Sequence, residues 1–595
     1  MVRLLAGLAL LLPGLFWWVW WGDRSKDPGE ALAGILGVSV AFISLIALFF
    51  YTIRVSITPP IFGLLIVLFL VGVVVGLVRQ HGAGINARWL LALAAFSLLC
   101  LWRLEQAQML VLPAWVDSLH HTLITRKMLE AGGLSSTLEP YLPGPFYYHY
   151  AVHAVSAAYA ALTGLHPAEA LLVVGQVLSA GISLSIYALV RPLVKDWRWA
   201  ALAGLLAAFA TKMPGFYLAW GRYTLLTGMV LLPLAMSEAL RVVQSQQRRQ
   251  AALALALLTA GTLLSHYFAA FLLALFLIIL ALLWLVHSLK AKQFHWVQLA
   301  WLAGPALGGL VLVSRWYWRV FRYSQGVFQT GVTLTAETAG NSNQWHYFWS
   351  LVGPYSGYVV LALAVIGVII SFFHPKSRGL ALWGLIVGLM ALPLGLHVAP
   401  FRSDHFALVL FLPACCLAAL CLDWACAQRR QPWQPAMLSA GITALVAFML
   451  IFGAQANWNA LNPDTLLADQ ADVAALEWID LHTPEDARFL INTTPWGYGL
   501  YRGVDGGAWI MPYTGRWSLV PTIFYTFGGD KAFTAQMTAW GERAASLQTC
   551  SEDFWSLVQE AKLQYLYLHA GKGSLQAAAL QGCEGLKQLY SAGGV

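Results

Sequence analysis

The residues that are hardest to explain by packing come just after a long apolar run. The run covers residues 87–104, and the segment Trp115–His121, which reads WVDSLHH, follows it. A carboxylate next to hydrocarbon is costly unless it pairs, binds an ion or takes part in chemistry. Asp117 is therefore the first candidate for a catalytic residue.

Other polar and aromatic residues recur next to later apolar runs. The candidates for substrate binding are His120, His121, Tyr148, His149, Arg222, Tyr223, His266, Arg402 and Asp404. Ionisable groups that gather at the mouth of a membrane bundle favour a catalytic or binding cleft. Arg222 and Arg402 are the candidates for binding a phosphate, because a guanidinium offers two parallel hydrogen bonds to phosphate oxygens.

Simpler roles are open for several of these residues. Asp117 can cap the following helix through the backbone amides of Leu119 or His120. His120 and His121 can be interfacial side chains, and Arg222 can be an anchor at the membrane interface. A divalent metal ion held by Asp117 with His120 or His121 is also open, because carboxylates and imidazoles both ligate such ions.

The composition places these residues in a membrane protein. The chain has 595 residues, of which 59% are hydrophobic and 10% are charged. Soluble domains carry about 25% charged residues, so we expect a polytopic α-helical membrane protein. The net charge of +8 comes from basic residues in short loops between apolar runs. Such residues set the orientation in the membrane, and we expect no nucleic-acid partner.

The apolar runs predict about fourteen membrane crossings, each needing roughly 20 residues to cross about 30 Å of hydrocarbon. Residues 251–286 are too long for one crossing, and basic residues flank them at 248–249 and 290–292. Both flanks are expected in the cytoplasm, so this run is predicted to form two helices with a turn near His266. The other predicted crossings are 4–21, 30–53, 60–79, 87–104, 168–190, 199–213, 223–241, 297–313, 356–373, 379–397, 405–426 and 436–454.

The basic loops also predict which residues face outward. They group on one face of the predicted bundle, which is assigned to the cytoplasm; their basic residues include Arg191, Lys195, Arg198, Arg241, Lys376, Arg378, Arg429 and Arg430. Asp117 and Arg222 then lie on the outer face. The apolar segment 150–163 is short for a crossing and is placed as a helix on the outer surface. The first outer loop is therefore expected to cover residues 105–167.

The chain changes character towards its C-terminus. Charges and turns become frequent, residues 469–481 have the periodicity of an amphipathic helix, and residues 488–493 and 564–569 alternate as strands do. These patterns predict a small α/β domain outside the membrane. Cys550 and Cys583 both fall in it and can pair if the compartment is oxidising.

The chain is thus divided into three parts. Residues 1–86 are expected to be additional N-terminal membrane helices, residues 87–455 the membrane core, and residues 456–595 the extracytoplasmic domain. The protein is expected in the cytoplasmic (inner) membrane, with membrane lipids among its partners.

Several motifs together resemble the type C glycosyltransferases, a superfamily that includes the protein mannosyltransferases and the lipid A aminoarabinose transferase. The likeness is greatest to uncharacterised bacterial members and covers the chain from about residue 87 onward. The segments that carry it are Trp115–His121, Leu129–Gly133, Tyr147–Tyr150, Leu162–Pro167, Trp220–Thr224, Asp505–Trp509 and Thr514–Arg516.

The resemblance implies a fold and a reaction. The expected fold is a type C bundle of about fourteen helices, and the expected activity is inverting transfer of a sugar from a polyprenyl-phosphate carrier to an acceptor outside the membrane. Asp117 matches the place of the family's essential carboxylate. Many relatives carry a second acid shortly after an arginine, but Arg222 is followed by Tyr223 and Thr224.

The missing acid leaves several mechanisms open. Asp404, Glu139 or Glu337 can replace it, the mechanism can use one carboxylate, or the activity can be lost. Two functions of other classes also stay open: a transporter or flippase for lipids or sugars, and a noncatalytic envelope scaffold. Transporters usually show internal repeats and polar groups near the middle of the membrane, whereas here the polar residues gather on one face.

Overall fold

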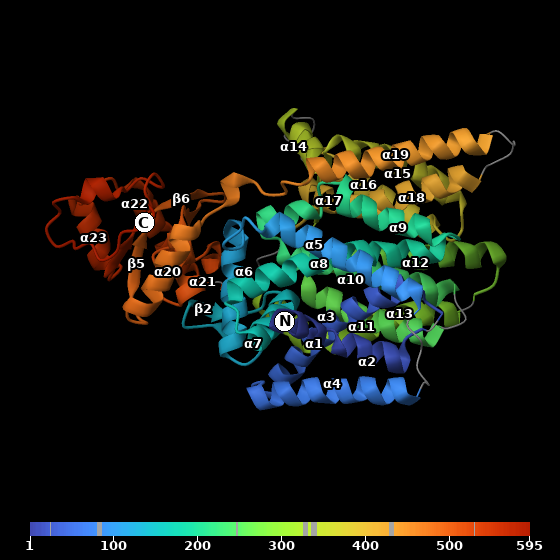
Figure 1. Ribbon diagram of the computed structural model, residues 1–595, viewed down its shortest axis with the longest axis horizontal. Helices are drawn as coiled ribbons and strands as arrows, with labels where there is room; N and C mark the ends of the chain where they lie inside the picture. The colour runs from blue at the N-terminus through green and yellow to red at the C-terminus, as the bar shows by residue number, and fades with distance from the viewer. Residues whose placement is uncertain are drawn as a thin grey trace.

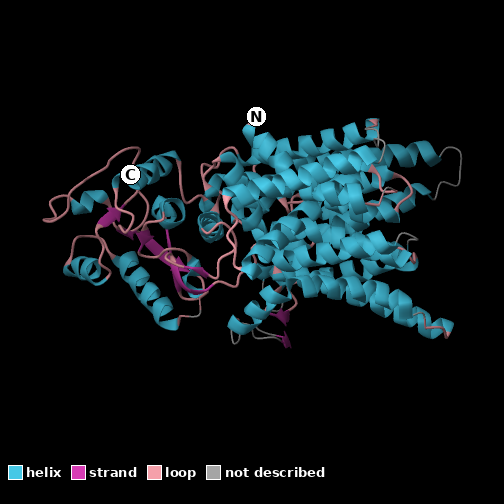
Figure 2. Cartoon of the chain, turned by 90° about the horizontal axis from the view of Figure 1, so that it is seen from below, coloured by secondary structure: helices cyan, strands magenta, loops and turns pink. Residues whose placement is uncertain are grey.

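The architecture is a bundle of long helices with a smaller body at one end (Figure 1). This computed structural model describes residues 1–595 apart from 24, 80–85, 245–247, 295, 325–330, 335–341, 428–433 and 529. Most strands lie in the smaller body, which is the C-terminal part of the chain (Figure 2). Glu337, Arg429 and Arg430 fall outside the described residues.

The first half of the bundle contains the N-terminal helices and the first outer segment. Its α-helices are α1 (Val2–Leu10), α2 (Leu12–Trp21), α3 (Pro28–Ile53), α4 (Pro59–Arg79), α5 (Ala87–Ala107), α6 (Trp115–Glu130), α7 (Ala151–Thr163), α8 (Pro167–Val190), α9 (Trp197–Leu205) and α10 (Tyr223–Gln244). Between α6 and α7 lie two short antiparallel strands, β1 (Thr137–Leu138) and β2 (Leu142–Pro145). The short helix η3 (Gly215–Trp220) precedes α10.

The second half completes the bundle. Its helices are α11 (Arg248–Ser265), α12 (Tyr267–Ala291), α13 (Trp296–Tyr323), α14 (Ser342–Val352), α15 (Tyr355–Phe373), α16 (Arg378–Ala391), α17 (Ser403–Val409), α18 (Phe411–Ala427) and α19 (Gln434–Ala456). The antiparallel strands β3 (Gly331–Leu334) and β4 (Leu396–Ala399) pair between them. The break between α11 and α12 falls at His266, where the sequence predicts a turn.

Helices are present at all fourteen predicted positions. Among the described residues, nine helices are long and apolar enough to cross a membrane, and α17 with α18 can form a tenth crossing that bends by 47°. The remaining positions, occupied by α9, α11, α16 and the described part of α19, hold shorter or less apolar helices. The protein is a multi-pass helical membrane protein as predicted, while fourteen crossings stays a prediction.

Helix α7 was predicted as a short surface helix, and it has 13 residues. At 1.5 Å per residue it is about 20 Å long, which is too short to cross about 30 Å of hydrocarbon. It begins after Tyr150, whose backbone N–H donates to the Leu264 carbonyl oxygen at 3.1 Å. It lies beside α6 at the end of the bundle that faces the smaller body (Figure 1).

Charged residues fasten the N-terminal helices to the core at the opposite end of the bundle. Helix α3 begins with a capping box between Asp27 and Glu30, which satisfies free backbone amides at the helix start. The Asp27 carboxylate also accepts a hydrogen bond from Arg191 Nε at 2.6 Å, and Glu30 pairs with Arg241. Two of the predicted basic loops therefore meet the start of α3.

The C-terminal part contains the predicted helix and strands. Its sheet has the order β8 (Trp517–Ser518), β5 (Arg488–Ile491), β9 (Tyr565–Tyr567), with both outer strands parallel to β5. The strands β6 (Thr493–Trp496) and β7 (Leu500–Gly503) form a hairpin. The helices are α20 (Gln470–His482), η6 (Gly506–Trp509), α21 (Ile510–Thr514), η7 (Ile523–Thr526), α22 (Lys531–Ser546) and α23 (Glu552–Glu560).

Two features tie this part together and to the bundle. Cys550 and Cys583 form a disulfide. Tyr513 of α21 bridges to the bundle, because its carbonyl oxygen accepts a hydrogen bond from Arg126 Nη1 at 2.6 Å and lies 3.0 Å from His166 Nε2. The His166 ring also stacks on Tyr513 with centroids 4.0 Å apart.

Candidate active site at the Asp117 end of the bundle

Asp117 and Arg222 face each other at the end of the bundle. Arg222 Nε lies 3.8 Å from Asp117 Oδ2, and the two side chains are 38% and 22% exposed. This separation is longer than the roughly 2.7–2.9 Å of a charge-assisted hydrogen bond. The start of α6 has Ala114 as its N-cap and no side-chain cap. The observed partner of Asp117 is therefore an arginine, which does not support the simple capping role.

A glycine brings the two residues together. Gly221 has a left-handed backbone with φ +60°, and a Cβ atom there would stand 2.3 Å from Ser118 Oγ and 3.0 Å from the Ala114 carbonyl oxygen. Only a residue without a side chain can approach the first turn of α6 this closely in this conformation. The close approach places Arg222, the next residue, opposite Asp117.

Arg222 retains bonding capacity. Its Nε atom is buried and has no hydrogen-bond partner among the described residues. The guanidinium carbon lies 6.0 Å from the centroid of the Trp220 ring. This nitrogen faces Asp117 Oδ2 at 3.8 Å, so its hydrogen-bonding capacity is directed toward the carboxylate and is unused.

Five histidines are packed behind this pair. They are His120, His121, His149, His153 and His266, and all are buried. His121 Nδ1 and His153 Nε2 are hydrogen-bonded at 2.9 Å, while His149 and His266 have ring centroids 4.8 Å apart. In the described part of the chain, three buried ring nitrogens of this cluster lack a hydrogen-bond partner: His120 Nδ1, His149 Nε2 and His153 Nδ1.

Burial keeps these histidines uncharged. Removal from water lowers the pKa of His120 to about 4 and that of His266 to about 3, because burial disfavours the charged imidazolium. The pKa of His121 is also lowered well below its usual value, by burial and by the neighbouring histidines. At neutral pH each ring therefore has one donor and one acceptor nitrogen.

Two tyrosines take different positions. Tyr148 is half-buried and contacts the rings of His120, His121 and His149, with centroids 5.9, 6.1 and 3.7 Å away. Burial raises the pKa of Tyr148, and the negative Asp117 raises it further, so the phenol keeps its proton. Tyr223 is fully buried; its ring lies edge-on to that of His121 with centroids 6.1 Å apart, and a Cβ at Gly175 would stand 2.3 Å from it. Tyr223 therefore packs against α8.

Arg402 and Asp404 pair with each other at the same end of the bundle. Arg402 donates to Asp404 through Nε at 3.1 Å and through Nη2 at 2.7 Å, and its Nη1 donates to the Tyr498 hydroxyl at 2.7 Å. Tyr498 lies in the turn of the β6–β7 hairpin, so this pair connects the bundle to the C-terminal part. Because Arg402 already binds two partners, Arg222 is the better placed candidate for a phosphate.

His266 links these groups. It begins α12 as the N-cap residue, and its Nδ1 accepts a hydrogen bond from the Phe268 amide at 3.1 Å. The ring of the next residue, Tyr267, stacks with Phe401 at 5.7 Å between centroids. His266 thus lies at the turn between α11 and α12, and its ring contacts that of His149 in the histidine cluster. The sequence-predicted site residues do lie at one end of the bundle.

Some residues at this end have roles that the sequence did not reveal. Arg319 on α13 donates through Nε to the Phe146 carbonyl oxygen at 2.6 Å and through Nη2 to the Ser136 carbonyl oxygen. It therefore holds the first outer segment. Trp115 packs edge-on against Trp496 of the β6–β7 hairpin, with centroids 5.2 Å apart. No sequence signal joined Trp115 to that hairpin.

The other acids considered for the second catalytic position differ in their surroundings. Glu139 is exposed between β1 and β2, and Asp404 is bound by Arg402. Asp117 and His121 do not belong to any group of three histidine, cysteine or acidic residues, among those described, whose ligand atoms all lie within 4.8 Å of one another. Such a group occurs elsewhere, in the C-terminal part.

An apolar groove begins at the far end of α6. It has a volume of about 680 Å³ and lies between α2, α3, α4 and α7, with Met128–Gly133 at its edge. Small residues on α7, among them Ala154 and Ala158, form one wall. Met128 is eleven residues after Asp117 on α6, a separation of about 17 Å along a helix.

Comparison of the sequence with known protein families assigns the chain to one of them. The sequence matches the family of unknown function DUF6541 over residues 7–595, and the chain belongs to that family. A search of curated proteins finds no match.

Solved structures similar to the chain include an oligosaccharyltransferase from Archaeoglobus fulgidus, in complex with zinc and sulfate, with 13% identity and a TM-score of 0.45 over 75% of this chain and 66% of that chain. Two others are ArnT from Cupriavidus metallidurans. The form bound to undecaprenyl phosphate has 14% identity and a TM-score of 0.49 over 79% of this chain and 95% of that chain. The apo form has 14% identity and a TM-score of 0.46 over 74% and 87%.

Proposed function

We propose that this member of the DUF6541 family transfers a sugar from a polyprenyl-phosphate carrier to an acceptor at the Asp117 end of the bundle. The observation that carries the proposal is the loose pair of Asp117 and Arg222, 3.8 Å apart. A carboxylate and a guanidinium with an unpartnered nitrogen stand side by side at the mouth of a membrane bundle. In a displacement reaction, the carboxylate can take the proton of the attacking hydroxyl group, and the guanidinium can bind the departing phosphate.

The proposed chemistry is a single inverting displacement. Asp117 takes the proton of the acceptor's hydroxyl group as that oxygen bonds to the anomeric carbon of the sugar. The bond from the anomeric carbon to the phosphate oxygen breaks, and its electron pair stays on the departing polyprenyl phosphate. Arg222 binds this phosphate, where its charge offsets the negative charge that develops. This mechanism uses one carboxylate.

The histidines and Tyr148 would bind the sugar without adding charge. Because their burial keeps the imidazoles neutral, Arg222 supplies the positive charge beside Asp117. The unpartnered ring nitrogens of His120, His149 and His153 can exchange hydrogen bonds with sugar hydroxyl groups. A protonated Tyr148 can donate one more.

The proposed orientation places the Asp117 end outside the cytoplasm. The disulfide between Cys550 and Cys583 lies in the C-terminal body at that end, and disulfides persist in oxidising compartments. Basic residues such as Arg191 and Arg241 lie at the opposite end, which suits the cytoplasmic face. We accordingly assign the protein to the cytoplasmic membrane, with residues 456–595 as an extracytoplasmic domain, residues 87–455 as the catalytic core and residues 1–86 as an addition.

Substitution of Asp117 tests the activity directly. Asp117→Asn keeps the size of the side chain but removes its charge and its capacity to accept a proton. We expect transfer from a polyprenyl-phosphate sugar to fall by about 10²- to 10⁴-fold, the usual contribution of a general base. Arg222→Lys is expected to raise KM for the donor more than it lowers kcat, because a single point charge replaces a two-pronged phosphate contact.

The control is Asp464→Asn, which changes an exposed aspartate that follows the bundle. It should retain transfer. An assay with the purified protein in vesicles and a panel of candidate acceptors measures all three variants. Full activity in Asp117→Asn would contradict the catalytic role and favour a transporter or a scaffold.

A further inference from the structure

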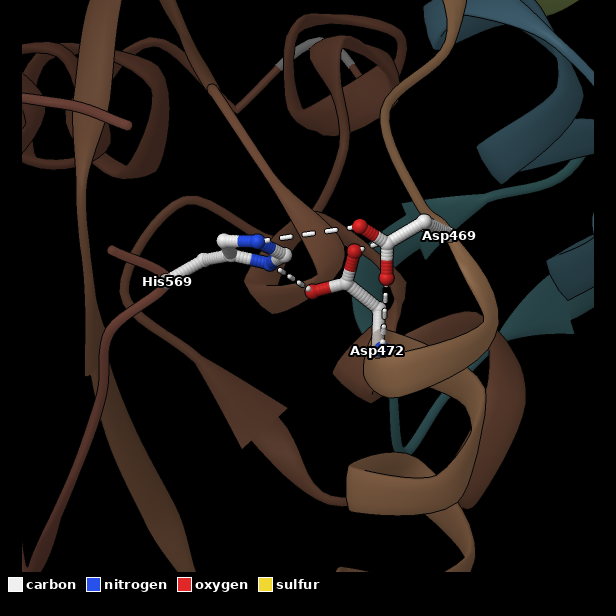
Figure 3. Close-up of side chains that lie close together, drawn as sticks. All are labelled: Asp469, Asp472 and His569. Carbon is white, nitrogen blue, oxygen red and sulfur yellow. Dashed lines mark hydrogen bonds and ion pairs between the residues drawn. The ribbon is translucent and has the colours of Figure 1, made fainter. Parts of the chain in front are cut away.

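A second group of ionisable residues lies in the C-terminal part, away from Asp117. Asp469 is the N-cap of α20, Asp472 lies in its first turn, and His569 follows strand β9. Their side chains converge, with the two ring nitrogens of His569 directed toward the carboxylates of Asp469 and Asp472 (Figure 3). Ligand atoms from the three residues all lie within 4.8 Å of one another.

The contacts of Asp472 fix the orientation of the histidine. Asp472 is fully buried, and its Oδ1 accepts hydrogen bonds from the Tyr567 hydroxyl at 2.5 Å and from His569 Nδ1 at 2.9 Å. Its Oδ2 accepts from the backbone N–H of Asp469 at 2.9 Å. Because Nδ1 is the donor to the carboxylate, a neutral His569 has its lone pair on Nε2.

That lone pair faces another acceptor. His569 Nε2 lies 3.6 Å from Asp469 Oδ2, a separation at which a neutral imidazole and a carboxylate can both bind one cation. Zinc takes imidazole nitrogen and carboxylate oxygen at about 2.0–2.2 Å, and in tetrahedral geometry two such ligands stand about 3.4 Å apart. The observed separation differs from this value by about 0.2 Å. A carboxylate that accepts from the other ring nitrogen is also the usual partner of a metal-binding histidine.

Asp505 gives independent support for a missing cation. It is fully buried, and its Oδ2 has no hydrogen-bond partner among the described residues. It lies next to the group, because a Cβ at the adjacent Gly506 would stand 2.3 Å from Asp472 Oδ1. A buried acceptor without a partner is costly, and a nearby cation would relieve that cost.

Acidic side chains outnumber basic ones around the group. Asp469, Asp472 and Asp505 gather there, and Lys572 Nζ lies 3.8 Å from Asp472 Oδ2. The acids would attract a cation held between them. An imidazole ligand favours transition metals such as zinc, whereas magnesium and calcium prefer sites made of oxygen ligands.

We propose that the C-terminal part binds a divalent transition-metal ion, with zinc as the best fit, through His569 Nε2 and Asp469 Oδ2. Asp472 is a positioning residue that orients the imidazole, and Asp505 adds negative charge nearby. The bound ion joins the start of α20 to the segment after β9. Because Asp469 is about half exposed, coordination positions stay open to water or to an anionic group of a ligand.

Metal binding by the purified full chain tests the proposal. The protein is dialysed against a chelator and then against Zn²⁺, and the bound metal is measured by mass spectrometry. We expect one ion per chain and a higher unfolding temperature when Zn²⁺ is present. His569→Gln should weaken binding by at least about 100-fold, and Asp472→Asn by about 10- to 100-fold, as is usual for a residue that orients a metal ligand.

The matched control is His482→Gln at the other end of α20, where the histidine is exposed. It should leave the affinity and the stoichiometry unchanged. A wild-type chain that binds no Zn²⁺, or binds it as well after His569→Gln, would show that the cluster is an ion-pair network only. The wild-type measurement decides this even if a variant fails to fold, and none of the variants changes Asp117 or Arg222.

Discussion

Asp117 and Arg222 come from segments that are far apart in the chain, and the backbone of one glycine allows them to meet. Gly221 combines a positive φ with contact distances that no side chain could occupy. The geometry of the candidate site therefore depends on this residue as much as on the charged pair itself.

Gly221→Ala is predicted to reduce transfer strongly. The new Cβ would meet Ser118 Oγ at 2.3 Å and the backbone atoms Ala114 O and Ser118 N at 3.0 Å, so the chain that follows η3 must move away from α6 and carry Arg222 with it. The left-handed backbone alone costs a non-glycine residue about 1–2 kcal/mol, and a misplacement of about 1 Å near reacting groups can cost about 100-fold in rate. Transfer assays and thermal unfolding measure both effects.

Gly164→Ala provides the matched control for this prediction. Gly164 also has a left-handed backbone, with φ +70°, but no atom would lie within 4 Å of an added Cβ. The Gly164→Ala variant should therefore lose stability only through the cost of its left-handed backbone. Equal losses of transfer in the two variants would show that backbone strain, and not the approach to α6, explains the effect.

The chemical types at the site could be predicted from the sequence, but their pairing could not. Asp117 and Arg222 are charged residues next to apolar runs, and that placement needs an explanation in any membrane protein. The binding of Asp404 by Arg402, the burial of Tyr223 and the hold of Arg319 on the first outer segment depend on tertiary contacts. Periodicity and hydropathy carry no information about such contacts.

At the scale of elements, hydropathy predicted where helices occur, because each helix in hydrocarbon must satisfy its own backbone hydrogen bonds. The break at His266 followed from two basic flanks around one overlong run. Packing could not be predicted in this way. Neither the groove between α4 and α7 nor the contact between the β6–β7 hairpin and Trp115 could be predicted from hydropathy.

The groove is predicted to hold the apolar tail of the lipid carrier. It starts at the end of α6, about 17 Å along that helix from Asp117, and its walls are mostly apolar. Ala158→Trp would place a large ring in this space. We expect KM for the polyprenyl-phosphate donor to rise about 10-fold or more with kcat largely kept, because uniform binding is lost and the reacting groups are untouched.

Leu91→Trp is the control, since Leu91 on α5 is 54% exposed and does not line the groove. Its donor KM should stay unchanged. If Ala158→Trp also left KM unchanged, or lowered kcat alone, the lipid tail would not lie in the groove.

At the scale of the whole molecule, the two ends of the bundle carry different groups. The Asp117 end carries the histidine cluster and the C-terminal part with its disulfide. The opposite end carries arginines such as Arg191 and Arg241, paired with acids at the start of α3. The positive-inside rule reads this asymmetry as an orientation, and the disulfide supports the same orientation through a different property, the redox state of the compartment.

Labelling from one side of the membrane is predicted to distinguish the two ends. Glu139 lies between β1 and β2 near the Asp117 end, Lys290 lies in the last turn of α12 at the other end, and both are exposed. In intact cells, Glu139→Cys should react with a membrane-impermeant maleimide, while Lys290→Cys should react only after the membrane is opened. The parent chain measures the background from its own cysteines. Reaction of both variants in intact cells would contradict the assignment of the ends, and reaction of Lys290→Cys alone would reverse it. A reversed orientation would place Asp117 on the cytoplasmic side, and the proposed reaction would then have to use a donor and an acceptor on that side.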